Sequence, residues 1–289
     1  MERFSEPLMI EVGGVHSYVH VAVFEPALEA KRSVLLIHDL AGRSDDFDPL
    51  AQQLAKMGFR VIAADFPGRG KSAHLPPDHY SLRMYMNALH AILRTHALES
   101  CWVLGQGWGS MIAILLENLI ARPFPNVILL DLPESWTYES DQISKAWGAL
   151  CEIDAENNDA FVLAAKDLFP MQGQSLVNAC ELLSERLRPK GDRIILPVDK
   201  HIFHNLEQSA TKRFDLAAAL AKSRSPINVL QSAFAAGRGT RTSEFASVNL
   251  GANIVMTSVL QCSQMSWKEK QMLLPTVGLF ASLLEEMIA

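Results

Sequence analysis

The sequence lacks long hydrophobic runs and any concentration of positive charge. Residues 126–132 form one short apolar run, and Glu117 with Asn118 interrupts the run at 111–121, so neither reaches the roughly 20 residues of a membrane span. The formal net charge is −6, and lysine and arginine do not cluster, which argues against nucleic acid and anionic membranes as partners. Residues 1–14 show no basic segment followed by an apolar one, so no signal peptide is predicted and we expect a cytoplasmic protein.

Cysteine is also scarce. The four cysteines, at 101, 151, 180 and 262, are far apart and form no C-x-x-C pair. This spacing excludes a disulfide framework and the usual zinc motifs, so we expect free thiols and neither a metal nor a cofactor. With 289 residues, 49% of them hydrophobic, the chain is long enough for one large domain, or for one domain with an insertion.

Apolar runs and amphipathic helical patterns alternate through the first half of the chain. Two alternating segments surround Gly13 and Gly14, which predicts a β-hairpin. The later apolar runs are continuous rather than alternating, which is typical of parallel strands covered by helices on both faces. The further strands are predicted at 33–40, 59–66, 100–107 and 125–133, with helices at 47–58, 81–98 and 108–121 between them.

The pattern changes after the strand at 125–133. Residues 134–205 carry helical patterns with little strand signal, and the alternation then resumes with a helix at 213–223, strands at 226–234 and 252–260, and a C-terminal helix at 270–288. We therefore predict one core in two pieces, residues 1–133 and 206–289, with a helical cap inserted at 134–205.

Four short motifs follow predicted strands in a recognisable order. They are LLIHDLAG at 35–42, ADFPGRGKS at 64–72, VLGQGWGSM at 103–111 and CSQMSWKEKQ at 262–271. Together they resemble the α/β-hydrolase fold, and the third motif is similar to its nucleophile elbow. Within this fold, the Q-G-W-G-S sequence most resembles the elbow motif of the branch of haloalkane dehalogenases and epoxide hydrolases. The resemblance implies a mostly parallel eight-stranded sheet with helices on both faces and a helical cap.

The positions that carry chemistry in this family are altered here. The resemblance places the nucleophile at Gly107 and the catalytic histidine at Gln264. No carboxylate follows the seventh predicted strand at the usual place, although Asp131 and Glu134 follow the sixth, where an acid can also lie. Asp39 stands in the oxyanion loop, where glycine is usual.

Each change removes one requirement of acyl transfer: the nucleophile, the general base or the stabilisation of the transition state. Glycine has no side chain with which to attack, and glutamine does not titrate, so Gln264 cannot act as a general base. A carboxylate at position 39 would oppose the negative charge of the transition state. Gly107 should adopt the positive φ of an elbow without strain. We therefore predict a degenerate catalytic triad and no hydrolase activity.

Other residues could in principle carry chemistry. Ser110 should lie in the first turn of a helix, which favours a structural role. A pair of Cys262 with His38 is conceivable, although a small buried thiol is the simpler interpretation. His201 and His204 have a spacing that can bind a metal, but no third ligand follows nearby, so no metal site is predicted.

The space between the sheet and the cap is the expected ligand pocket. We predict that its floor and lid draw on His38, Asp39, Leu40, Gln106, Gly107, Trp108, Gln264, Met265 and Trp136, together with Tyr138, Trp147 and Phe161. Alternatively, these aromatic side chains fill the cavity as core.

The preferred interpretation is a pseudo-enzyme that binds a small, partly apolar molecule or a protein partner. One alternative is an enzyme with non-hydrolytic chemistry in the same pocket, a lyase or a cofactor-free oxygenase. Another is a conventional ester, epoxide or halide hydrolase whose nucleophile at position 107 was mutated.

Overall fold

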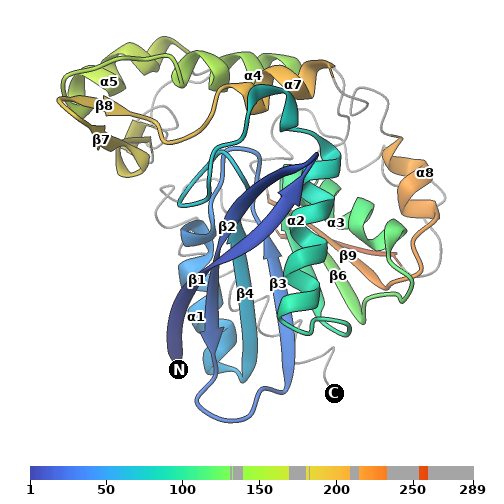
Figure 1. Ribbon diagram of the computed structural model, residues 1–289. Coiled ribbons are helices and arrows are strands. Elements are labelled where there is room, and N and C mark those ends of the chain that lie inside the picture. Colours follow the sequence, from blue (N-terminus) through green and yellow to red (C-terminus); the bar gives the residue numbers. More distant parts are fainter. Residues whose placement is uncertain are drawn as a thin grey trace.

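The computed structural model describes residues 1–130, 132, 139–168, 180–181, 183–208, 215–232 and 254–259. An eight-stranded sheet forms its centre (Figure 1). Only the first two pairings, β1 with β2 and β2 with β4, are antiparallel; the other neighbours run parallel. The predicted mostly parallel eight-stranded sheet is thus confirmed. In sheet order the strands are β1 (Glu2–Val12), β2 (Val15–Glu25), β4 (Phe59–Asp65), β3 (Arg32–Ile37), β5 (Trp102–Gln106), β6 (Asn126–Leu130), β9 (Ile227–Ser232) and β10 (Ile254–Val259).

The predicted N-terminal hairpin is present and longer than its alternating pattern suggested. Each strand has 11 residues, and Val12 pairs with Val15 across the turn. The turn glycines, Gly13 and Gly14, have φ angles of 57° and 82°, as a tight hairpin turn requires. The second strand then joins the parallel part of the sheet through His20–Phe24, which pairs with β4.

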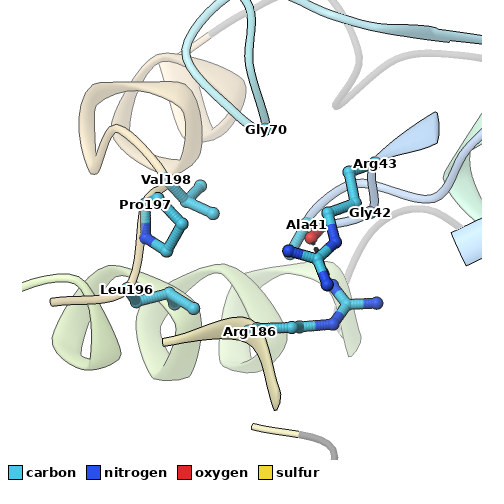
Figure 2. Close-up of a pocket in the computed structure, with 8 residues that line it drawn as sticks. All are labelled: Ala41, Gly42, Arg43, Gly70, Arg186, Leu196, Pro197 and Val198. Atoms are coloured by element: carbon cyan, nitrogen blue, oxygen red, sulfur yellow. Dashed lines mark hydrogen bonds between the residues drawn. The ribbon is translucent and has the colours of Figure 1, made fainter. Parts of the chain in front are cut away.

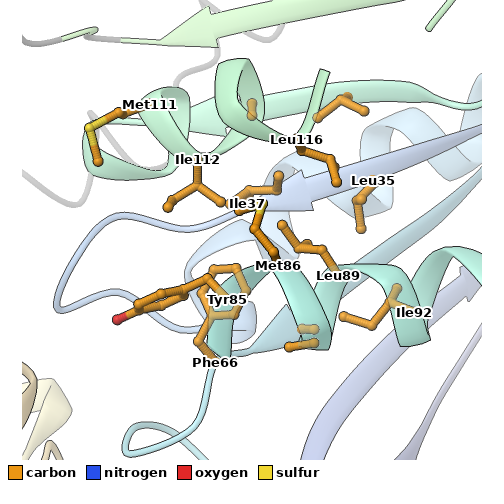
Figure 3. Packing of buried hydrophobic residues seen from close by; sticks show 14 of the residues in the cluster. Leu35, Ile37, Phe66, Tyr85, Met86, Leu89, Ile92, Met111, Ile112 and Leu116 are labelled. Atoms are coloured by element: carbon orange, nitrogen blue, oxygen red, sulfur yellow. The ribbon is translucent and has the colours of Figure 1, made fainter. Parts of the chain in front are cut away.

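Helices cover both faces of the sheet, as predicted. Helix α1 (Asp48–Lys56) packs on the face reached by Val34 and Leu36, whereas α2 (Leu82–Thr95) and α3 (Trp108–Leu119) pack on the face reached by Leu35 and Ile37. Alternate residues of one strand therefore feed two separate cores. Figure 3 shows the larger core, in which side chains of α2 and α3 meet those of β3. Helix α8 (Leu216–Ala221) adds Leu220 to the same core.

An inserted segment lies across one end of the sheet, at its carboxyl edge (Figure 1). It contains α4 (Glu139–Leu150), α5 (Asn158–Ala165), a short 3-10 helix (Lys166–Leu168), β7 (Arg188–Lys190), β8 (Arg193–Ile195) and α7 (His201–Gln208). Two further 3-10 helices, Ser44–Phe47 and Pro77–His79, belong to loops of the core.

The β7–β8 hairpin was not predicted, because its strands have three residues each and no apolar alternation. Its one sequence signal is Gly191, which has a φ of 63°. The predicted limits of the insertion, 134 and 205, stay a prediction.

The helix predicted at 270–288 lies outside the described residues. Within the part of the chain that the structure describes, no helix has both the length and the apolar character needed to cross a membrane.

Candidate functional site

The sharp turn between β5 and α3 has the geometry of a nucleophile elbow. Gly107 occupies the turn with φ 54° and ψ −120°, which confirms the positive φ predicted from the sequence. The flanking glycines allow the close approach that the turn needs: a Cβ atom on Gly105 would lie 2.4 Å from the carbonyl oxygen of Gly109, and one on Gly109 would lie 2.3 Å from that of Ile37. The elbow architecture is therefore intact at a position that bears no side chain.

The carboxylate of Asp39 lies at this elbow. Its Oδ1 accepts hydrogen bonds from the backbone N–H groups of Leu40 and Trp108, each at 2.8 Å. In this type of elbow, the oxyanion hole is made by the N–H of the residue after the nucleophile and an N–H from the loop after β3. Trp108 and Leu40 are those two residues. The donors that would bind a transition-state oxyanion thus bind an oxygen of the protein itself.

Asp39 and Gly107 also compete for the same space. A Cβ atom built on Gly107 would lie 2.5 Å from Oδ1, 2.6 Å from Cγ and 2.9 Å from Oδ2 of Asp39. All three distances are shorter than van der Waals contact, so the carboxylate fills the volume that an elbow side chain needs. The first turn of α3 favours this arrangement, because a helix N-terminus attracts negative charge.

His38 is a structural residue. It is 1% exposed, its Nε2 accepts a hydrogen bond from the N–H of Phe66 at 3.1 Å, and its Nδ1 lies 2.7 Å from the carbonyl oxygen of Asp39. Nε2 therefore carries no proton, and Nδ1 donates. Burial, followed by the positive charge of Arg69, lowers the pKa of His38 to about 3. A neutral imidazole with both nitrogens engaged has no nitrogen left for a ligand or for Cys262.

A buried arginine fixes the loop that carries Asp39, and sequence reasoning missed it. Arg69 is fully buried, and its guanidinium donates to the carbonyl oxygen of Leu40 at 2.7 Å and to the hydroxyl of Tyr85. The guanidinium carbon also lies 5.3 Å from the centroid of the Tyr85 ring, a cation–π distance. The sequence signal was the ADFPGRGKS motif at 64–72, which indicated the fold but gave no role to the arginine within it.

The remaining predicted site residues divide into three groups. Leu40 and Trp108 are buried in the larger core, where Trp108 meets the ring of Tyr85 edge-on at 4.5 Å. Gln106 ends β5 beside the elbow and is partly exposed. Several predicted residues lie outside the described part of the chain: Gln264, Met265, Trp136, Tyr138, Asp131, Glu134 and Cys262.

Two aromatic residues that were predicted for the lid pack inside the insertion. Phe161 is fully buried in a small core of the inserted segment, and Trp147 stacks on Phe203 with the ring centroids 6.3 Å apart. The alternative interpretation, in which cap aromatics serve as core, describes both residues.

The other candidate nucleophiles and ligands are structural. The hydroxyl of Ser110 is buried within hydrogen-bond distance of the carbonyl oxygens of Gly105 and Leu130, at 2.8 and 3.0 Å. Burial raises the pKa of the Cys101 and Cys151 thiols to about 12, so neither is a reactive thiolate. Among the described residues, no group of three or more metal-ligating side chains occurs, and His201 and His204 are part of none.

Comparison with known proteins gives matches to hydrolases. A family model described as the alpha/beta hydrolase fold matches residues 32–230. A zearalenone hydrolase of Bionectria ochroleuca is 31% identical over 125 residues, which cover 39% of this chain and 47% of that protein. A proline iminopeptidase of Lactobacillus helveticus is 35% identical over 89 residues, 29% of this chain and 30% of that protein. The match thus spans less than half the length of either relative.

A solved structure of a putative hydrolase from Rickettsia typhi superimposes over nearly the whole chain. The TM-score is 0.73, and 99% of each chain is covered. The sequence identity is 16%, so this likeness concerns the fold alone.

Proposed function

This chain belongs to the α/β-hydrolase fold family, and we propose that it is a non-hydrolytic member that binds a small, partly apolar molecule or a protein partner. One observation carries the proposal: Oδ1 of Asp39 accepts hydrogen bonds from Leu40 and Trp108, the two donors of the oxyanion hole. The relatives named above are hydrolases, but a shared fold does not imply a shared reaction.

The occupied donors oppose acyl transfer in two ways. A substrate carbonyl would have to displace the carboxylate before the two N–H groups could bind it. Its oxygen would then gain negative charge close to a carboxylate, so the transition state would be destabilised where a hydrolase stabilises it. Loss of a single oxyanion donor typically lowers kcat by about 10²–10³-fold, and here both donors are engaged.

The fit between positions 39 and 107 argues against a hydrolase inactivated at one position. A serine or aspartate at position 107 would place its Cβ 2.5 Å from Oδ1 of Asp39. A nucleophile restored by changing Gly107 alone would therefore require the carboxylate of Asp39 to leave its place. Gln264, the position of the missing base, lies outside the described residues, and its role stays a prediction.

A second function is favoured by the position of the same carboxylate. Asp39 is exposed, and all three of its carboxylate atoms lie within 2.9 Å of the place of an elbow Cβ. The carboxylate thus stands where substrates react in this fold. It could orient a substrate or accept a proton from it in a lyase-type reaction that needs no covalent attack. His38 could not share this role, because both its ring nitrogens are engaged.

Hydrolysis of p-nitrophenyl acetate, butyrate and octanoate tests the proposal. We expect no turnover above the uncatalysed rate for the wild-type protein, and no labelling by a fluorophosphonate. Turnover that is lost in Asp39→Asn would contradict the binding proposal and support chemistry at the carboxylate. Turnover or labelling that is lost in Ser110→Ala or Cys262→Ala would contradict both candidates.

A further inference from the structure

Two buried arginines hold the loop after β3 directly after Asp39. The guanidinium of Arg69 donates to the carbonyl oxygen of Leu40 at 2.7 Å. The guanidinium of Arg186, which belongs to the inserted segment, donates to the carbonyl oxygen of Ala41 at 2.6 Å (Figure 2). The backbone beside Asp39 is therefore fixed from the core and from the insertion, and it presents the carboxylate at the elbow in a defined position.

The elbow presents a negative charge to solvent. Oδ1 of Asp39 is bound by two neutral backbone donors, which stabilise the ionised carboxylate but do not cancel its charge. Asp39 is exposed. Arg69 lies beside the same loop, but it is 0% exposed and donates to Leu40 and Tyr85. A ligand that approaches from solvent therefore meets the carboxylate and not the guanidinium.

This arrangement discriminates between head groups of opposite hydrogen-bonding character. A carboxylate or carbonyl ligand needs the N–H groups of Leu40 and Trp108, which both donate to Oδ1 of Asp39 at 2.8 Å. An anionic ligand would also be repelled by the fixed carboxylate. A donor group meets the opposite condition, because an ionised carboxylate only accepts hydrogen bonds. Charged donors gain most, since their hydrogen bonds are roughly twice as strong as those of neutral donors.

We propose that Asp39 determines the ligand specificity of the elbow: the site accepts a small molecule with a protonated amine and excludes carboxylates. The position that stabilises a developing anion in a hydrolase thus recognises a cation in this protein. The inference rests on the proposed binding function, because it names the ligand class of the same site.

Titration of the ¹⁵N-labelled full chain with butylamine, butanol and pentanoate tests this specificity. The three compounds share a butyl chain and differ in the head group, and butylamine is protonated at neutral pH as a lysine side chain is. We expect butylamine to shift the amide resonances of Leu40 and Trp108, because both N–H groups donate to the carboxylate that the amine contacts. Butanol should bind about tenfold more weakly, and pentanoate should leave both resonances unchanged.

Two variants of Asp39 separate its charge from its occupation of the N–H donors. Asp39→Asn keeps a carbonyl oxygen but loses the charge, so the preference for butylamine over butanol should disappear. Asp39→Ala leaves the N–H groups of Leu40 and Trp108 without the carboxylate. Formate has the size of the lost group and should then shift both resonances, with no effect on the wild type. Asp78→Asn, which changes an exposed aspartate of a core loop, should match the wild type in every titration.

The inference is overturned if butanol or pentanoate shifts the two resonances at as low a concentration as butylamine, or if none of the three does. It is also overturned if Asp39→Asn retains the preference, or if formate has no effect on folded Asp39→Ala. Should Asp39→Ala not fold, the comparison of wild type with Asp39→Asn decides. Ester turnover by the wild type would contradict the proposed function, whereas equal binding of the three compounds by a protein without turnover would contradict this inference alone.

Discussion

A carboxylate and a glycine share one site at the elbow. Oδ1 of Asp39 satisfies two backbone donors, and Gly107 provides the space in which the carboxylate lies. His38 and Arg69 hold the backbone at Asp39 and directly after it, through the carbonyl oxygens of Asp39 and Leu40 respectively. At the scale of single residues, the glycine at position 107 and the aspartate at position 39 depend on each other, because the carboxylate lies where a side chain at position 107 would begin.

Gly107→Ser is expected to destabilise the protein by about 1–3 kcal/mol for the backbone conformation alone, and by more because of the clash with Asp39. Gly14→Ser is the matched control: Gly14 also has a positive φ, of 82°, but nothing lies within 4 Å of its Cβ position. Urea denaturation measures both losses. Adding Asp39→Ala should recover part of the loss in Gly107→Ser and none of that in Gly14→Ser. Equal losses in the two single variants would contradict the steric argument.

At the scale of elements, α3 is held at both ends by buried polar side chains. Ser110, near its start, lies within hydrogen-bond distance of carbonyl oxygens of Gly105 and Leu130. Glu117, near its end, is 1% exposed and its Oε1 accepts from the N–H groups of Arg224 and Ser225 and from the Ser225 hydroxyl. The acid that interrupts the apolar run of α3 therefore ties the helix to the segment before β9.

Glu117→Ala should lower the free energy of unfolding by about 2 kcal/mol or more, because it leaves buried donors without an acceptor. Glu117→Gln retains a carbonyl oxygen at the same place and should lose only about 1 kcal/mol. Equilibrium denaturation in urea compares the two variants. If alanine and glutamine cause the same loss, the hydrogen bonds to Oε1 do not hold the segment.

At the scale of the whole molecule, the insertion joins the core at several points along the carboxyl edge of the sheet. Arg186 bonds to Ala41 and Asp46, and Val198 forms a β-bridge with Arg69. At a third point the hydroxyl of Tyr80 donates to Oδ2 of Asp199, at 2.8 Å. These contacts fix the insertion on the loops at the carboxyl edge of the sheet.

Asp199 makes the third contact sensitive to acid. Burial alone would raise the pKa of this carboxyl, but hydrogen bonds from His74, the backbone of His201 and Tyr80 outweigh it and lower the pKa from 3.8 to about 2. A carboxyl whose pKa is lower in the folded state contributes stability above its unfolded pKa and loses it as the pH falls through the folded value. We expect the contribution to be complete above about pH 4 and to disappear towards pH 2.

The difference in unfolding free energy between wild type and Asp199→Asn, measured from pH 2 to pH 6, tests this expectation. The difference should shrink as the pH falls from about 4 to 2. Tyr80→Phe removes one hydrogen bond from the carboxylate and should move the loss to higher pH. Asp192→Asn, which changes an exposed aspartate in the β7–β8 turn, is the control. A difference that stays constant with pH would contradict the role of Asp199.

The sequence by itself determined the order of strands and helices, the parallel sheet and the elbow. Continuous apolar runs, amphipathic helices and turn glycines such as Gly13, Gly14 and Gly107 act over a few residues, so their structural meaning is readable from local pattern. The three-residue strands β7 and β8 were missed because so short a segment has no periodicity. Short, irregular elements depend on what packs against them.

Only the tertiary structure decided what the site contains. Asp39 was recognised as unusual, but its hydrogen bond to Trp108 spans 69 positions, and the contact of Arg186 with Asp46 spans 140. Arg69 and Glu117 are charged residues that sequence patterns would place at the surface, yet both are buried at contacts between elements. Such contacts depend on where the packed sheet and helices bring side chains in space. The sequence predicted an elbow with Gly107 at its centre; the parallel pairing of β3 with β5 brings the carboxylate of Asp39 to that turn.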